Sequence, residues 1–273
     1  MDEPLVRKPA VAGRFYQASG AALRRQVGSF VVKDLPKADA IGCILPHAGY
    51  MYSGSIAGRT VSALKVRPHL LLLGPNHTGM GAPFSVSSRQ SWETPLGKCE
   101  PDRGLADALI AECPFLQEDR QAHLAEHSLE VELPFFQYFS DDFRILPVCI
   151  GSEDFVKLQE LGRAIAAAVD KAASRDSVLI AASSDMTHYE DSRSAKEKDD
   201  AALEAIVSFD AKELYRRVHE KGISMCGYAP VIVLLTAAGL LGARCAKVVA
   251  YSNSGMVNGD NSSVVGYAGV VIS

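Results

Sequence analysis

Short apolar runs alternate along this 273-residue chain with longer stretches of helical periodicity. The apolar runs have the length and the Val/Ile/Leu content of buried strands, and they span residues 41–45, 70–73, 145–150, 178–182, 247–251 and 264–272. The helical patterns occupy residues 54–64, 102–111, 155–173, 197–207, 211–218 and 229–241. Residues 84–100, which contain turn-forming Pro95 and Gly97, predict a β-hairpin or excursion.

Strands that alternate with helices favour an α/β fold, with a mostly parallel central sheet flanked by helices. No internal repeat, low-complexity tract or Pro/Gly/Ser-rich linker divides the sequence. We therefore expect residues 1–273 to form a single domain. Apolar residues make up 48% and charged residues 22% of the chain, which is ordinary for a globular protein with a sizeable core.

The formal net charge of -4 provides no electrostatic surface for nucleic acid. The longest apolar stretch, residues 231–241, is too short to span a membrane. The amino terminus lacks the apolar core of a signal peptide. The six cysteines include no Cys-x-x-Cys pair. These features predict a cytoplasmic protein with reduced thiols.

Two histidines follow strand-like runs at similar positions, and each is soon followed by glycine. His47 comes just after residues 41–45, and His77 comes after residues 70–73. Ligand sites of open α/β sheets gather beyond the carboxyl ends of the strands. We interpret the two imidazoles as metal ligands; the alternative is that each only caps a helix or fills a turn.

The residues leave the third ligand open. Cys226 precedes the helix predicted from residue 229, where a helix amino terminus would favour the thiolate; alternatively, it is a small buried hydrophobe. Asp185 and His188 follow the strand at 178–182. They could supply a ligand or a carboxylate that orients a histidine. Their alternative is an Asp helix cap beside a surface histidine.

Residues 123–127 match H-x-x-E-H, the inverted zinc-peptidase pattern. The pattern is short enough to arise by chance, and no acidic ligand helix follows it. We therefore favour His127 alone as a candidate acid/base group.

Seven motifs together resemble those of the Memo family, whose bacterial and archaeal members are called component B of the AmmeMemoRadiSam system. They occur in order over essentially the whole chain: RKPAVAGRFY (7–16), PHAGY (46–50), GPNH (74–77), EHSLE (126–130), SDMTH (184–188), MCG (225–227) and SVVGYAG (263–269).

The resemblance implies a fold similar to that of class III extradiol dioxygenases, non-haem iron enzymes that cleave catechol rings. It implies His47, His77 and Cys226 as the metal ligands. His127, Asp185 and His188 would line the same pocket. His127 and His188 would form the acid/base pair, with His188 oriented by Asp185.

The implied site contains a thiolate where ring-cleaving enzymes use a carboxylate. We expect Fe(II), with Cu(I) or Zn as the alternative, and redox or O₂-linked chemistry on a small molecule. The alternative function is a non-catalytic adaptor whose inherited pocket recognises phosphotyrosine peptides. The family name further implies an AMMECR-type protein and a radical-SAM protein as pathway partners.

Overall fold

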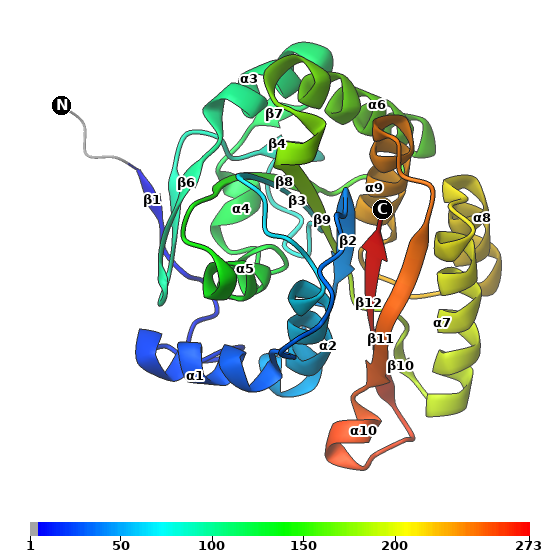
Figure 1. The fold of residues 1–273 in the computed structure, drawn as a ribbon. Helices are drawn as coiled ribbons and strands as arrows, with labels where there is room; N and C mark the ends of the chain where they lie inside the picture. Colours follow the sequence, from blue (N-terminus) through cyan, green and yellow to red (C-terminus); the bar gives the residue numbers. More distant parts are fainter. Residues whose placement is uncertain (1–4) are drawn as a thin grey trace.

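The structure, a computed structural model, describes residues 5–273. At the centre of its sheet lie four parallel strands, in the order β8 (Arg144–Ile150), β3 (His69–Pro75), β9 (Val178–Ser183) and β2 (Gly42–Leu45). Helices cover both faces of this sheet (Figure 1). The predicted α/β fold, with a mostly parallel central sheet flanked by helices, is confirmed.

The margins of the sheet are mixed. Beside β2, β12 (Val264–Ile272) runs antiparallel and pairs in turn with β11 (Ala246–Asn253) and β10 (His188–Glu190). Beside β8, the strand β6 (Gly97–Pro101) is parallel and forms a hairpin with β5 (Ser91–Thr94), as predicted for residues 84–100. Short strands complete these margins: β1 (Val6–Arg7), β4 (Phe84–Val86) and β7 (Gln117–Glu118).

The central strands are apolar on both faces, so each face packs against its own helices. In β3, Leu71 and Leu73 point into one core cluster, and Leu70 and Leu72 into the other. The first cluster is covered by α3 (Arg103–Glu112), α6 (Phe155–Ala172), α7 (Ser192–Val207), α8 (Ala211–Lys221) and α9 (Tyr228–Leu241). The second is covered by α1 (Gly20–Phe30), α2 (Tyr50–Ser62) and α5 (Leu133–Phe139).

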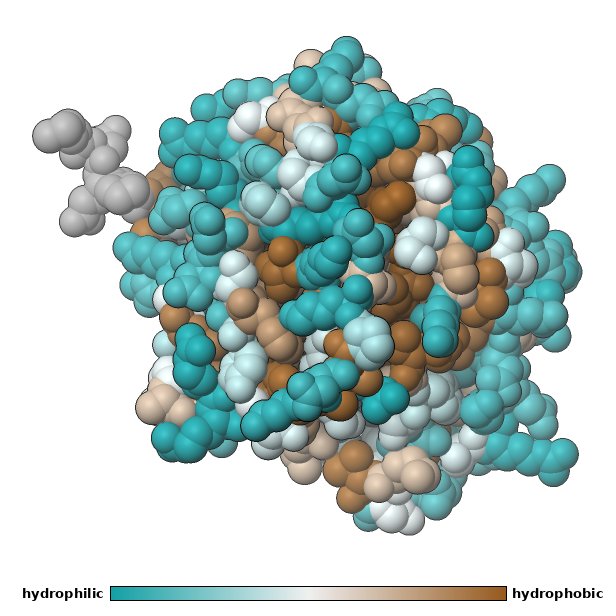
Figure 2. All heavy atoms as spheres, viewed as in Figure 1, coloured by the Kyte–Doolittle hydropathy of each residue, from teal (hydrophilic) through white to brown (hydrophobic). Residues whose placement is uncertain are grey.

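The remaining helical turns are short: α4 (Gln121–Leu124), α10 (Gly255–Asn258), and the 3₁₀ turns η1 (Glu130–Glu132) and η2 (Arg175–Ser177). In the described part of the chain, no helix combines the length and apolarity that crossing a bilayer requires. Figure 2 shows a face on which hydrophobic residues gather near the middle among hydrophilic ones.

Candidate metal centre

The carboxyl ends of β2, β9 and β3 bring the predicted histidines to one edge of the sheet. These three strands are parallel neighbours, so their carboxyl ends meet at the same edge. His47 lies two residues beyond β2, and His77 two residues beyond β3. Their ring centroids are 5.1 Å apart. The structure therefore brings the two histidines together as expected.

Cys226 joins them from the loop between α8 and α9. Its Sγ lies 3.2 Å from His47 Nε2. The loop is held against β9 by the Gly227 N–H, which donates to Ser184 Oγ at 3.0 Å. The donor atoms of His47, His77 and Cys226 all lie within 4.8 Å of one another.

The hydrogen bonds of His47 leave Nε2 available to a metal. The ring is buried, with 2% of the residue exposed, and Nδ1 lies 2.7 Å from Ser183 Oγ. Because that hydroxyl donates its hydrogen to Ser128 O at 2.8 Å, it accepts the Nδ1 proton of His47. The lone pair is thereby assigned to Nε2, on the side of Cys226.

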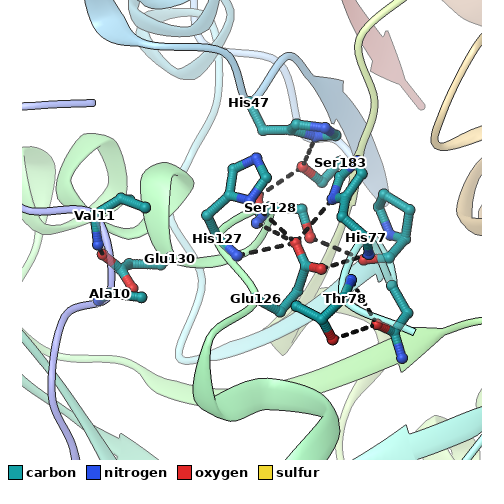
Figure 3. Close-up of polar contacts among 12 residues, drawn as sticks. Ala10, Val11, His47, His77, Thr78, Glu126, His127, Ser128, Glu130 and Ser183 are labelled. Carbon is teal, nitrogen blue, oxygen red and sulfur yellow. Dashed lines mark hydrogen bonds and ion pairs between the residues drawn. The ribbon is translucent and has the colours of Figure 1, made fainter. Parts of the chain in front are cut away.

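Glu126 does for His77 what Ser183 does for His47: it accepts the Nδ1 proton and leaves Nε2 available (Figure 3). Its Oε1 lies 2.9 Å from His77 Nδ1, and its Oε2 accepts the His77 N–H at 2.6 Å. Burial alone would raise the pKa of Glu126, but the hydrogen bonds and charge of His77 and a backbone N–H hold it at about 2. An ionised carboxylate therefore fixes the His77 tautomer with Nε2 free.

The donor set fits a tetrahedral or open metal site. Metal–nitrogen and metal–sulfur bonds of about 2.0 and 2.3 Å place ligand atoms about 3.5 Å apart. The 3.2 Å between Cys226 Sγ and His47 Nε2 is close to that value, and all separations among the three donor atoms are within 4.8 Å. Both imidazoles already carry the outer hydrogen bonds of histidine ligands.

The side chains of His77, Glu126 and His127 form a second compact group of possible metal ligands. It does not fit a metal, because Glu126 already accepts two bonds from His77 and one each from the N–H groups of His127 and Ser128. Three of these bonds converge on Oε1, whose two lone pairs they share, and the His77 Nδ1 proton that faces Oε1 leaves no room for an ion between these two atoms.

The Cys226 thiol differs from the sequence-based expectation. Burial, followed by the charge of Asp185, raises its pKa in the metal-free protein. The amino terminus of α9, which would favour the thiolate, does not outweigh these two effects. The thiol is therefore protonated until a metal displaces the proton.

Asp185 and His188 also differ from expectation. Asp185 Oδ1 accepts the backbone N–H of His47 at 2.8 Å and so fixes the loop after β2. Burial raises the pKa of Asp185 to about 7, against the hydrogen bonds of the His47 and Ala48 N–H groups. His188 is oriented by Ser224 instead, with Nδ1 3.0 Å from Ser224 O. The expected orientation of His188 by Asp185 is therefore wrong.

His127 stacks on His77, with ring centroids 4.9 Å apart, and its other side meets the edge of Phe15. Burial lowers the pKa of His127, as it does that of His188. His123, by contrast, is fully buried beside Trp92, and both its ring nitrogens lack partners among residues 5–273. It stands outside both ligand groups, so the H-x-x-E-H motif does not form a zinc site.

Sequence reasoning missed Ser183 and the role of Glu126. The sequence places Glu126 in the H-x-x-E-H and EHSLE motifs without giving it a role, and Ser183 is the last residue of a strand. Their positions were the available signal. Ser183 lies where the loop after a strand begins, and Glu126 lies in a loop that returns to the site.

The fold and these side chains define a class of protein: an α/β protein with two histidines and a cysteine at the ends of parallel strands. A sequence model described as Memo-like protein matches residues 7–271. The chain belongs to the Memo-like family, as the motif resemblance predicted.

Relatives match over nearly the full chain. A MEMO1 family protein of Methanosarcina barkeri is 42% identical over 269 residues, covering 98% of this chain and 100% of the relative. One of Aquifex aeolicus is 39% identical over 270 residues, covering 97% and 98%. The crystal structure of an uncharacterized protein from Escherichia coli K12 has a TM-score of 0.60 at 14% identity, covering 85% and 99%, and shares the fold.

Proposed function

We propose that this protein binds one Fe(II) ion through His47, His77 and Cys226 for redox or O₂-linked chemistry on a small molecule. The observation that supports the proposal is the convergence of three donor atoms within 4.8 Å. Because thiolate ligands also suit Cu(I) and Zn, these two metals remain the alternatives. Bound iron would supply the electron-transfer and O₂-binding capacity of the site.

His127 and His188 supply the proton chemistry in this proposal. Their lowered pKa values keep both rings neutral near pH 7, so each can accept a proton from a bound molecule. The Nδ1 proton of His188 faces Ser224 O, which leaves Nε2 as its basic atom. Asp185 holds the His47 backbone rather than taking part in this transfer.

The test is anaerobic purification followed by elemental analysis for iron, copper and zinc. We expect about one iron per chain in the wild type, and none in His47→Ala or Cys226→Ser. His219→Ala, which removes an exposed histidine of α8, is the matched control and keeps its iron. Stoichiometric copper or zinc would overturn the choice of iron.

The absence of all three metals, even after reconstitution, would overturn the enzyme proposal and favour the adaptor function. If iron is bound, O₂ consumption with catechol as the probe tests the chemistry. We expect His127→Ala and His188→Ala to consume O₂ more slowly than the wild type. A cytoplasmic location and a pathway shared with AMMECR-type and radical-SAM proteins stay predictions of the family resemblance.

A further inference from the structure

Glu132 is a buried carboxyl group to which the proposed function gives no role. It ends the turn η1, and only 1% of the residue is exposed. Neither of its oxygens has a hydrogen-bond partner among residues 5–273. Its chain neighbours Val131 and Leu133 belong to the buried cluster that also contains Cys43 of β2, and the Tyr50 hydroxyl of α2 donates to Val131 O at 2.6 Å. Glu132 therefore lies in the core behind the strand that carries His47.

An unpaired carboxylate in such a place is strongly disfavoured, whereas the neutral acid costs much less. Burial raises the pKa of Glu132 well above its ordinary value, and the charge of Asp185 acts in the same direction. The side chain consequently carries a proton near pH 7. It can donate a hydrogen bond, which a carboxylate cannot do.

The polar side chain beside it is that of Ser183, whose hydroxyl lowers the Glu132 pKa against the larger effect of burial. Toward a neutral Glu132 the same hydroxyl can serve as an acceptor. Ser183 Oγ accepts the Nδ1 proton of His47 at 2.7 Å and donates to Ser128 O at 2.8 Å. A hydroxyl has one hydrogen and two lone pairs. One lone pair of Ser183 is therefore left for a second donor. An ionised Glu132 would instead compete with Ser128 O for the Ser183 hydrogen.

We propose that Glu132, as a neutral acid, is a positioning residue that completes the hydrogen bonding of Ser183 and thereby holds His47 with Nε2 toward Cys226. This inference rests on the proposed metal site for its purpose. The ring orientation itself belongs to the metal-free protein, so it can be tested separately.

The test compares Glu132→Gln, which keeps a donor without a charge, with Glu132→Leu, which removes the polar group. Histidine-ring ¹⁵N NMR of the metal-free protein reports which His47 nitrogen carries the proton. We expect wild type and Glu132→Gln to keep one tautomer with a slowly exchanging Nδ1 proton. In Glu132→Leu the two tautomers mix, and the affinity for zinc, used as the probe, falls about tenfold.

His123→Leu is the control, because it also removes an unpartnered buried polar side chain but leaves the Ser183 network intact. An unchanged His47 ring and zinc affinity in Glu132→Leu would overturn the proposal. An effect of Glu132→Gln as large as that of Glu132→Leu would also overturn it, because a charge would then be required.

Infrared spectroscopy keeps the proposal testable if Glu132→Leu does not fold. The wild-type spectrum minus that of Glu132→Gln should show the carbonyl stretch of a protonated carboxyl group at neutral pH, because Asp185, whose pKa is about 7, contributes to both spectra and cancels. The absence of this band from the difference spectrum would show an ionised Glu132 and overturn the proposal. Failure of the wild type to bind any metal would defeat the proposed function, while the NMR result would still decide the role of Glu132.

Discussion

Each candidate histidine ligand has a different partner for its Nδ1 proton. His47 faces the neutral hydroxyl of Ser183, whereas His77 faces the ionised Glu126. A carboxylate partner increases the basicity of the imidazole more than a hydroxyl does. At the scale of residues, the two ligands are therefore unequal, and His77 is the stronger electron donor to a metal.

Glu126→Gln should weaken metal binding by about 10- to 100-fold, because the amide cannot accept all four hydrogen bonds that the carboxylate receives. Competition titration with zinc measures the loss. The matched control is Glu118→Gln, whose carboxylate accepts the N–H and hydroxyl of Ser88 away from the site. Equal affinities in the two variants would show that Glu126 does not support His77.

His123 predicts a pH dependence of stability. Burial, followed by the charge of Arg7, lowers its pKa to about 4. The unfolded chain, with a histidine pKa of about 6.5, then binds more protons between these values, so stability falls as the pH drops through this window. From pH 7 to pH 5, the free energy of unfolding should lose about 2 kcal/mol through this residue.

Urea unfolding of the metal-free protein at both pH values checks this prediction. His123→Leu should lose about 2 kcal/mol less than the wild type over the same interval. Other titrating groups are common to both proteins and cancel in the comparison. Parallel losses in the two proteins would contradict the lowered pKa.

The sequence identified His47 and His77 because each directly follows a recognisable strand. Cys226 could not be assigned from its neighbours alone, since its partner His47 lies 179 positions away. The Ser183 contact was missed for a similar reason. A hydroxyl at the end of an apolar run gives no sign of the ring that it will face.

At the scale of elements, the amino-terminal segment secures the loop that carries Glu126 and His127. Arg7 forms a fully buried ion pair with Glu130 at 2.7 Å and donates to His123 O and Glu126 O. Glu130 also accepts the N–H groups of Ala10 and Val11 and the Tyr16 hydroxyl. The RKPAVAGRFY motif is thus explained by packing around one carboxylate.

Arg7→Met should reduce the free energy of unfolding by about 3–5 kcal/mol, because it leaves the Glu130 charge buried without its partner. Chemical denaturation measures this change. The neighbouring Lys8 forms an exposed pair with Glu93, so Lys8→Met should change stability by less than about 1 kcal/mol. Similar costs for the two variants would refute the assignment of the buried pair.

All six strands predicted from apolar runs are present, because buried parallel strands are apolar on both faces. The helices α1 and α5 were missed. For α1 a signal existed: Ser19 caps the helix, and Leu23 and Val27 are spaced four apart on its buried face. Strand order could not be predicted, because it depends on contacts between segments that are distant in the sequence.

At the scale of the whole molecule, the metal centre joins three distant parts of the chain. β2 and β3 supply the histidines, and the loop before α9 supplies the cysteine. A metal that binds only the folded protein stabilises it by linkage, by about 2.7 kcal/mol at a free concentration 100-fold above Kd. For a chain of this size, each kcal/mol raises Tm by about 2 °C.

Zinc, used as an air-stable probe at that excess, should therefore raise Tm by about 5 °C. The gain should increase with pH at fixed zinc, because the Cys226 thiol is protonated in the metal-free protein and must lose its proton to bind. One released proton corresponds to about tenfold higher affinity per pH unit, or about 3 °C more in Tm. Differential scanning calorimetry at pH 7 and pH 8 tests both effects. His47→Ala should show neither effect, and a zinc-induced shift that is the same at both pH values would exclude the thiol as a ligand.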